Sequence, residues 1–324
     1  MNNHLETIEI KNFKCFKDFK AEGLKRVNLI GGKNNVGKTA FMEGCFINVN
    51  AINLKNFVDA LQAIKGMREN LNILDESVNN INYNKFIKEY IEQSNNIYTN
   101  SNLNWASFKI KDEAGIKQYI FEFNKQYIKV NINDFSYEID TIKNIKFIDN
   151  FGLSNSNIIT LYSSIQKKKE EQFLNDILNK FDDRIESFKV INNKPTCEID
   201  GNYYEITEFG DGVRHLISIV TALFACEDGY LFIDGIDNGI HYTQLDEIWT
   251  IILEVSKKLN VQVFATTHSK ECIESYARVA KKLEDEDISF IELGHDKNNE
   301  LKAMTFPYKW FIDEVEQNHE VRGW

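Results

Sequence analysis

The chain has 324 residues, 43% of them apolar, and includes 23 phenylalanines and 13 tyrosines. This composition excludes a disordered protein, because so much apolar and aromatic surface can be buried in a core. The net charge of −11 disfavours a broad nonspecific face for nucleic acid, since such a face needs an excess of Lys and Arg.

The cysteines and the apolar runs indicate the cellular compartment of the protein. The five cysteines are scattered and form no C-x-x-C pair, which predicts reduced thiols and no zinc site. The N-terminus lacks the basic start and apolar run of a signal peptide, and no later segment approaches the length of a membrane span. We therefore expect a soluble, cytoplasmic protein without membrane contact.

The first third of the chain contains its strongest motif. Residues 5–10 alternate as a strand would, residues 11–19 form a basic and aromatic turn, and residues 27–30 are a short apolar strand. Residues 32–39 then satisfy the phosphate-loop pattern G-x-x-x-x-G-K-[ST] without a gap or substitution. A helical pattern begins at Ala40, so the loop lies between a strand and a helix N-terminus, which favours an anion.

This motif predicts a site for ATP and Mg2+. The glycines let backbone N–H groups point at phosphate oxygens, Lys38 supplies a cation, and the Thr39 hydroxyl can ligate Mg2+. The alternative is a Gly/Asn turn with a coincidental lysine, but the flanking strand and helix favour the nucleotide site. The residues expected to bind the nucleotide here are Gly32, Asn34, Asn35, Val36, Gly37, Lys38, Thr39 and Ala40.

The middle of the chain shows mixed patterns and no second set of motifs. Its alternating runs predict an antiparallel sheet, because one face of each strand is apolar and the other polar. The expected elements are helix over residues 40–65, helix with Asn-rich loops over 67–98, antiparallel sheet over 105–148, helix over 157–181, and a hairpin of 188–191 with 203–206.

The last third changes character. After a turn at residues 208–212 come an apolar helix (213–226), a strand (229–234), a helix (242–259) and a strand (261–267). Near-continuous apolar strands separated by helices are typical of a parallel sheet covered on both faces.

The phosphate loop and this last third would then be two halves of one nucleotide-binding core. The expected divisions are residues 1–45 for the first half, 46–206 for an inserted helical and β region, 207–295 for the second half, and 296–324 for a C-terminal tail.

Two polar residues end the late strands. Asp234 terminates an apolar strand, where a Walker-B carboxylate would hold the Mg2+ water shell opposite Thr39; a capping Asp is the alternative. His268 follows the next strand, where its imidazole could reach a γ-phosphate; a packing or capping histidine is the alternative. Ligands of open α/β sheets collect at strand C-termini, which favours the functional interpretation of both.

Taken together, the motifs resemble those of the ABC-type ATPases of the OLD, RecF and SMC superfamily. The resemblance is closest to short bacterial AAA-labelled ATPases akin to the ATPase domains of OLD nucleases, and it runs from Ile8 to about Phe290 with the motifs in the family's order. It rests on Asn12-Phe13-Lys14, residues 32–39, Phe209-Gly210-Asp211-Gly212, Leu231-Phe232-Ile233-Asp234, Asp237-Asn238-Gly239-Ile240-His241 and Thr266-Thr267-His268-Ser269.

The resemblance implies an α/β fold of the ABC-type P-loop ATPase head, with a mixed sheet, an antiparallel β subdomain and an inserted helical lobe. It also implies a head-to-head homodimer with ATP between the protomers, which could assemble further. Gly210, Asp211 and Gly212 would be the signature loop that approaches the partner's γ-phosphate, and a plain helix-entry turn is the alternative. Asn238 and His241 would belong to the loop that crosses the dimer seam, and Lys14 would lie near the nucleotide.

One departure from the family matters for catalysis. The family's Walker-B motif ends in an Asp-Glu pair whose Glu polarises the attacking water, whereas this chain has Asp234-Gly235. Losing such a group costs about two to four decades in the chemical step. Asp237 is a candidate replacement, and we expect tight ATP binding with slow hydrolysis.

The resemblance also implies that a separate protein supplies the nuclease or other effector activity. OLD enzymes carry a Toprim nuclease after the ATPase, and this chain is too short to hold one. We therefore expect a separate Toprim-like nuclease or other effector, with nucleic acid as a further partner, in DNA maintenance or defence against phage. A catalytically inactive ATP-binding scaffold is a second interpretation. A small GTPase is a third, but no Asn-Lys-x-Asp motif appears at the end of a late strand, where Thr266-Thr267-His268-Ser269 stands instead.

Overall fold

The computed structural model describes residues 4–53, 56–57, 59–61, 63–64, 97–113, 116–123, 126–131 and 144–317. The helix with Asn-rich loops expected over residues 67–98 lies outside these ranges as far as residue 96, and at its end a strand begins at Tyr98 instead. The chain divides into two compact units, residues 1–23, 35–142 and 294–304 in the first and residues 24–34, 143–293 and 305–324 in the second. The division crosses the phosphate-loop pattern after Asn34.

The first unit contains an antiparallel sheet and helix α1 (Lys38–Asn50). Helix α1 packs closely on the sheet at Gly44, where a Cβ atom would collide with the side chain of Ile10. The antiparallel sheet expected within residues 105–148 is confirmed for three of its strands, which pair in succession. In spatial order the strands are β2 (Phe16–Glu22), β1 (Thr7–Phe13), β4 (Tyr98–Ser101), β5 (Trp105–Glu113), β6 (Ile116–Phe123) and β7 (Gln126–Asn131).

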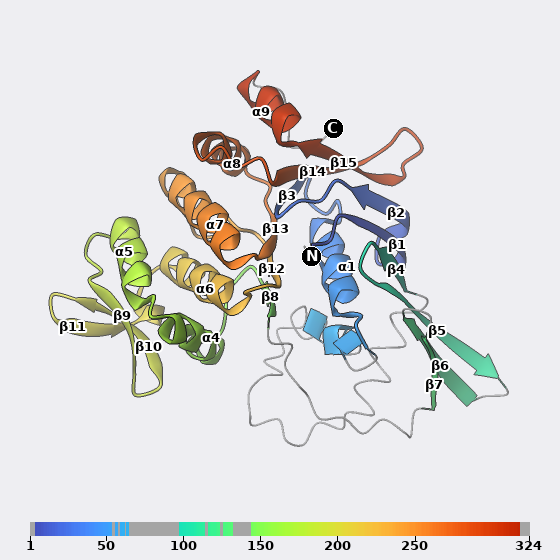
Figure 1. The fold of residues 1–324 in the computed structure, drawn as a ribbon, viewed down its shortest axis with the longest axis horizontal. Coiled ribbons are helices and arrows are strands. Elements are labelled where there is room, and N and C mark those ends of the chain that lie inside the picture. Colours follow the sequence, from blue (N-terminus) through green and yellow to red (C-terminus); the bar gives the residue numbers. More distant parts are fainter. Residues whose placement is uncertain are drawn as a thin grey trace. The chain divides into compact units, whose positions relative to one another are not determined.

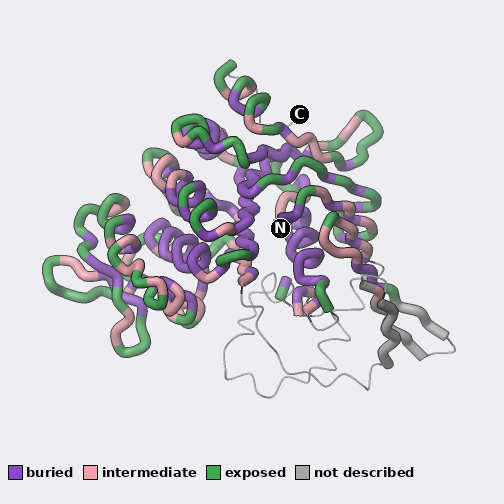
Figure 2. The backbone as a smooth tube through the Cα atoms, viewed as in Figure 1, coloured by how far each residue is buried: buried purple, intermediate pink, exposed green. Residues whose placement is uncertain are grey.

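The second unit is built on parallel strands. Strands β3, β12 and β13 are buried along their whole length, which matches their unbroken apolar sequences (Figure 2). Strand β8 was expected in the antiparallel region but pairs in parallel with β12 instead, because its partner comes from the last third of the chain. The sheet order is β15 (Leu301–Pro307), β14 (Ile288–His295), β3 (Val27–Gly32), β13 (Gln262–Thr266), β12 (Tyr230–Ile233) and β8 (Ile145–Ile148).

Helices α6, α7 and α8 lie side by side along the parallel strands (Figure 1). Helix α6 spans Asp211–Ala225, α7 spans Leu245–Leu259 after a 3-10 turn at Tyr242–Gln244, α8 spans Lys270–Lys282, and α9 spans Tyr308–Glu316. Trp249 of α7 and Tyr276 of α8 pack with ring centroids 4.4 Å apart, and the buried tyrosine hydroxyl donates to the carbonyl of Val27 at 2.9 Å. Large aromatic side chains therefore join the helices to the sheet with their polar atoms satisfied.

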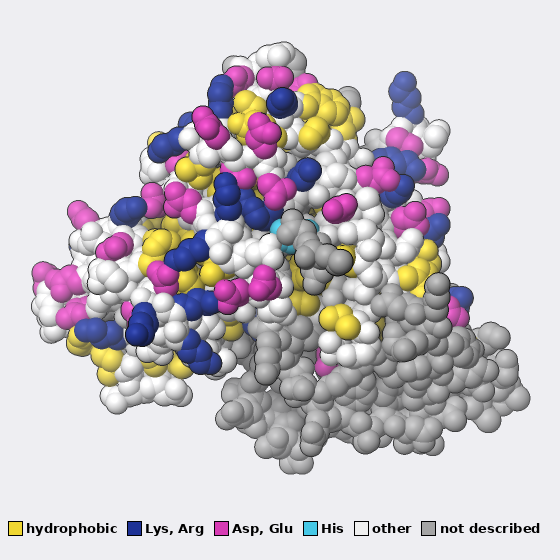
Figure 3. All heavy atoms as spheres, viewed as in Figure 1, with side chains coloured by type: hydrophobic (Ala, Val, Ile, Leu, Met, Phe, Trp, Pro, Cys, Tyr) yellow, Lys and Arg dark blue, Asp and Glu magenta, His cyan; other side chains and the backbone are white. Residues whose placement is uncertain are grey.

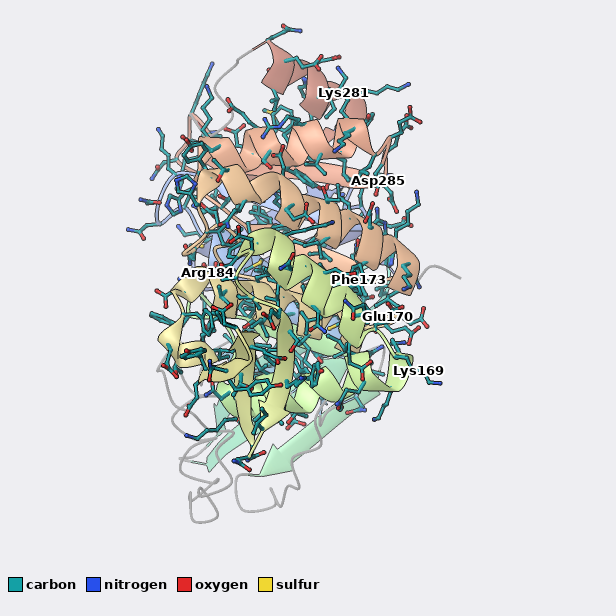
Figure 4. The ribbon with its side chains drawn as sticks, turned by 90° about the vertical axis from the view of Figure 1, so that its left-hand side faces the viewer. Lys169, Glu170, Phe173, Arg184, Lys281 and Asp285 are labelled. Atoms are coloured by element: carbon teal, nitrogen blue, oxygen red, sulfur yellow. The ribbon has the colours of Figure 1, made fainter. Side chains whose placement is uncertain are left out.

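A lobe of two helices and a small sheet completes the second unit. The helix expected over residues 157–181 is two helices, α4 (Asn155–Lys168) and α5 (Glu171–Phe181), because Lys169 adopts a left-handed conformation with φ of 59°. Figure 4 shows Lys169 and Glu170 at this junction, and Glu170 is ion-paired with Lys258 of α7. Phe173 of α5 contacts Phe224 of α6 with ring centroids 5.8 Å apart, which fixes the lobe on the helical layer.

The prediction that residues 188–191 and 203–206 pair as a hairpin is wrong. Strands β9 (Ser187–Ile191) and β11 (Asn202–Glu205) both pair with β10 (Lys194–Ile199), which lies between them. A short 3-10 turn, Ile206–Glu208, then leads to α6.

The helical surface of the second unit has mixed charge. Figure 3 shows Lys and Arg side chains interspersed with Asp and Glu side chains over the helices. Many of the cations are paired, including Lys180 with Glu247 at 3.2 Å and Lys168 with Glu227. Among the helices that the structure describes, none is both long and apolar enough to cross a membrane.

Candidate nucleotide site

The phosphate loop has the backbone conformation that an anion site needs. Gly32, Asn35 and Gly37 have positive φ angles of 137°, 61° and 104°, so the chain turns repeatedly before α1 begins at Lys38. Successive turns of this kind aim backbone N–H groups into one concave space. Helix α1 has no side-chain cap hydrogen bond and no acidic residue in its first turn, so no carboxylate of that turn would repel an anion at its N-terminus.

The turn between β1 and β2 lies against this loop within the first unit. A Cβ atom on Gly37 would be 2.7 Å from Sγ of Cys15 and 3.6 Å from Cζ of Phe16, so a side chain has no room there. Lys14, which was expected near the nucleotide, forms an ion pair with Glu43, a buried residue of α1. Its contact with nucleotide remains a prediction, as does the joint hold of Thr39 and Asp234 on Mg2+.

In the second unit the candidate residues meet at one edge of the parallel sheet. The register pairs Ile30 of β3 with Thr266 of β13, and Ala265 of β13 with Ile233 of β12. The first residues of the phosphate loop, up to Asn34, the 266–269 segment and Asp234 therefore all follow the carboxyl ends of neighbouring strands. This edge is where open α/β sheets bind ligands.

Asp234 is half-buried and held by the neighbouring strand. The hydroxyl of Thr266 donates to Oδ1 of Asp234 at 2.7 Å and accepts from the N–H of Gly235 at 2.8 Å. The Asp234 N–H donates to the carbonyl of Ile148 at 2.9 Å. These bonds hold the carboxylate in a fixed position at the strand end, as a metal-holding role requires.

The remaining residues of the 266–269 segment have separate partners. Thr267 donates to Oδ1 of Asp237 at 2.8 Å, so the candidate replacement for the missing glutamate is hydrogen-bonded within its own unit. His268 is exposed. Ser269 caps α8 by accepting from the N–H of Cys272 at 3.1 Å.

Gly235 is the residue around which the Walker-B loop folds. Its φ is 68°, and a Cβ atom on it would lie 2.7 Å from Oδ1 of Asn150 and closer still to Nδ2 of Asn238. The side chain of Asn238 donates to Oδ1 of Asn150 at 3.0 Å. The space that a side chain at position 235 would need is therefore filled by an amide pair.

The glycine-rich corner at the start of α6 packs against the same loop. Gly212 is buried, and a Cβ atom on it would lie 2.5 Å from the carbonyl oxygen of Gly239. Gly210 and Asp211 are exposed. His241 is also exposed, with Nδ1 2.9 Å from the hydroxyl of Thr243. The structure thus brings the expected signature and seam loops together within one chain.

Sequence reasoning missed Asp149 and His215. Asp149 follows β8 as Asp234 follows β12, and the repeated pattern of an apolar strand ending in Asp was the available signal. Burial raises the pKa of Asp149, as does the nearby Asp234, whereas the hydrogen bond from Phe151 N–H and the charge of Arg214 lower it.

His215 lies in α6, and no sequence signal marked it. Its side chain is buried, and among the described residues neither ring nitrogen has a partner within hydrogen-bond geometry. Burial lowers the pKa of His215 to about 4, and the backbone of Ile236 acts in the opposite direction.

With this geometry in place, the family comparison is informative. Residues 123–274 match the family described as "AAA domain, putative AbiEii toxin, Type IV TA system". This part of the chain is similar to that family. The matched residues include the lobe, the signature corner, Asp234 and His268.

Relatives and solved structures support the same fold. An "ATP/GTP phosphatase" of Helicobacter pylori is 23% identical over 330 residues, covering 86% of this chain and 89% of that protein. An uncharacterized protein of Methanocaldococcus jannaschii is 40% identical over 47 residues, covering 14% of this chain and 22% of that protein. The SMC head solved with the C-winged helix domain of ScpA aligns with a TM-score of 0.52 at 11% identity, covering 97% of this chain and 99% of that one. The expected ABC-type ATPase head fold is confirmed.

Proposed function

We propose that the protein is an ATP-dependent switch of the OLD-like type, which dimerises head to head around bound ATP and hydrolyses it slowly. Residues 32–40 bind the triphosphate, Thr39 and Asp234 hold Mg2+, and His268 contacts the γ-phosphate. The uncapped N-terminus of α1 and the positive φ angles of the loop support the nucleotide part of this proposal.

The conformation of Gly210 is the observation that supports dimerisation. Its φ of −65° and ψ of 161° are open to any residue, and a Cβ atom on it would meet no described atom within 4 Å. Neither backbone strain nor crowding within the described residues accounts for a glycine here. Close approach of the partner's γ-phosphate to a bare helix N-terminus does account for it.

Slow hydrolysis follows from the Walker-B loop. Position 235 has no side chain to polarise water, and Asp237 is bonded to Thr267. A long-lived ATP-bound dimer would present a stable surface, with Asn238 and His241 at its seam, to a separate effector such as a Toprim-like nuclease or to nucleic acid. We place this switch in the cytoplasm, in DNA maintenance or defence against phage. A catalytically inactive scaffold is the alternative, which an ATPase rate of zero would select.

GTP is the competing nucleotide. The Helicobacter pylori relative is named for both ATP and GTP, which keeps a GTP-using protein as the second candidate. Competition of each nucleotide against a fluorescent ATP analogue would decide between them.

The test of the proposed function is the molar mass in solution with and without nucleotide. Light scattering after size exclusion should give a dimer in saturating Mg-ATP and a smaller species in Mg-ADP. The variant Lys38→Ala should bind neither nucleotide tightly and should not change mass. A mass that is unaffected by ATP, at nucleotide concentrations shown to saturate the site, would rule the dimerising switch out.

A further inference from the structure

The structure offers a carboxylate close to the position where Gly235 has none. Asp149 directly follows β8 and Asp234 directly follows β12, and the register pairs Ile148 with Ile233. The hydrogen bond from Asp234 N–H to the Ile148 carbonyl joins the two strand ends at this level. Asp149 and Asp234 are therefore neighbours across two adjacent parallel strands.

The side chain of Asp149 is held in place while one of its oxygens stays available. Oδ1 accepts from the N–H of Phe151 at 2.8 Å, and the Asp149 carbonyl accepts from the N–H of Gly152 at 3.0 Å. Arg214 of α6 donates to the carbonyl of Leu153 at 2.9 Å and so fixes the loop that follows. Among the described residues, no donor is bonded to Oδ2 of Asp149. This oxygen can accept a hydrogen bond from water.

The other two carboxylates at this edge each accept a hydrogen bond from a threonine hydroxyl. Asp234 accepts from Thr266 at 2.7 Å, and Asp237 accepts from Thr267 at 2.8 Å. Among the described residues, Asp149 accepts only from the main chain of its own loop, and it is half-buried at a strand end. Of the three, it is the carboxylate that no threonine of this edge binds.

We infer that Asp149 orients the attacking water and carries the residual ATP hydrolysis of this chain. The inference rests on the proposed ATP-binding function. In this step the water oxygen forms a bond to the γ-phosphorus as the bond from that phosphorus to the β,γ-bridging oxygen breaks. The electron pair leaves with ADP, and the proton of the water passes to the Asp149 carboxylate and then to solvent.

The decisive variant is Asp149→Asn, which removes the charge but keeps Oδ1 as an acceptor for Phe151. Single-turnover hydrolysis of Mg-ATP should fall about 10²- to 10⁴-fold, the usual effect of losing such a group. Affinity for a fluorescent ATP analogue and the melting temperature should stay at the wild-type values. Asp149→Glu, which restores the carboxylate, should recover part of the rate.

Asp228 provides a matched control, because it lies at the opposite end of β12 from Asp234. Asp228 precedes β12, is exposed, and accepts from the side chain of Asn260 at 2.8 Å. Asp228→Asn removes the same charge far from the strand end that carries Asp234. Its hydrolysis rate should equal that of the wild type.

The outcomes separate this inference from the proposed function. A wild-type rate in Asp149→Asn overturns the inference, and so does an equal loss of rate, affinity and melting temperature in the Asn and Glu variants. If the wild type binds ATP and dimerises but never hydrolyses it, the inference fails, the ATP-dependent dimer stands, and the catalytically inactive scaffold is selected. If the wild type binds no nucleotide, both fail.

Discussion

Asn238 donates from Nδ2 to Oδ1 of Asn150 over 3.0 Å, across the space that a side chain on Gly235 would occupy. The two residues lie in the loops that follow different strands, β12 and β8, so this bond ties the Walker-B loop to the loop that leads into α4. The glycine at position 235 is thus a structural requirement of the amide pair as well as the loss of a catalytic group.

Installing the missing glutamate should therefore fail to restore activity. Gly235→Glu places a side chain at φ of 68° and against the amide pair, so the free energy of unfolding should drop by about 1–3 kcal/mol without faster phosphate release. Urea unfolding and a phosphate assay measure both effects. Gly201→Glu is the matched control, because Gly201 has φ of 74° and open space around it. If the two variants lose the same stability, the collision with the amide pair is absent.

Alanine at Gly212 should affect stability, whereas alanine at Gly210 should affect dimerisation. Gly212→Ala should lower the melting temperature, since its Cβ atom would press on the Gly239 carbonyl. Gly210→Ala should fold like the wild type but lose ATP-dependent dimerisation, because its space is open within the chain. Thermal unfolding and light scattering distinguish the two variants. Dimerisation of Gly210→Ala at wild-type ATP concentrations would contradict the assigned role of this glycine.

His215 should make stability depend on pH. Its pKa falls from 6.5 to about 4 on folding, so below pH 6.5 the unfolded state binds a proton that the folded state does not, until the pH nears 4. The free energy of unfolding is therefore unaffected by this group above pH 6.5 and decreases as the pH falls. The decrease is about 2 kcal/mol between pH 7.5 and 5. His215→Leu should remove this part of the pH dependence, and urea unfolding at both pH values measures it. The same pH difference in the variant and the wild type would contradict the assignment.

The buried ion pair of Arg26 should be a major contributor to the stability of the second unit. Arg26 pairs with Asp285 and donates to the carbonyl of Leu253 at 3.1 Å, and both charged side chains are buried. Arg26→Met leaves Asp285 buried without its cation and should cost about 3–5 kcal/mol. The double variant Arg26→Met/Asp285→Leu should recover much of this loss in urea unfolding. No recovery would show that the other bonds of Arg26 matter more.

Cys15 should report on nucleotide binding. It is exposed, the other four cysteines are buried, and its Sγ lies beside Gly37 of the phosphate loop. Saturating Mg-ATP should slow its alkylation by N-ethylmaleimide several-fold, as followed by intact-mass spectrometry. Cys15→Ser should take up no label in the folded protein. Equal labelling rates with and without ATP would show that the triphosphate does not cover this side of the loop.

The sequence by itself determined the features that depend on short, contiguous segments. The phosphate loop is eight residues in a row, and the conformation of Gly37 and the start of α1 at Lys38 follow from those residues locally. The buried parallel strands were predicted for the same reason, since β12 and β13 are unbroken apolar runs. The α/β class and the position of Asp234 at a strand end thus needed no tertiary information.

Only the tertiary structure decided which strand ends are neighbours. Strand β8 has an ambiguous short pattern, and its place beside β12 depends on a pairing between segments far apart in the chain. That pairing brings Asp149 beside Asp234 and Asn150 against Asn238, and a separate long-range contact places Gly212 against Gly239. Contacts of this kind depend on which long-range pairings close the sheet, and the local pattern of each strand carries no information about its neighbours.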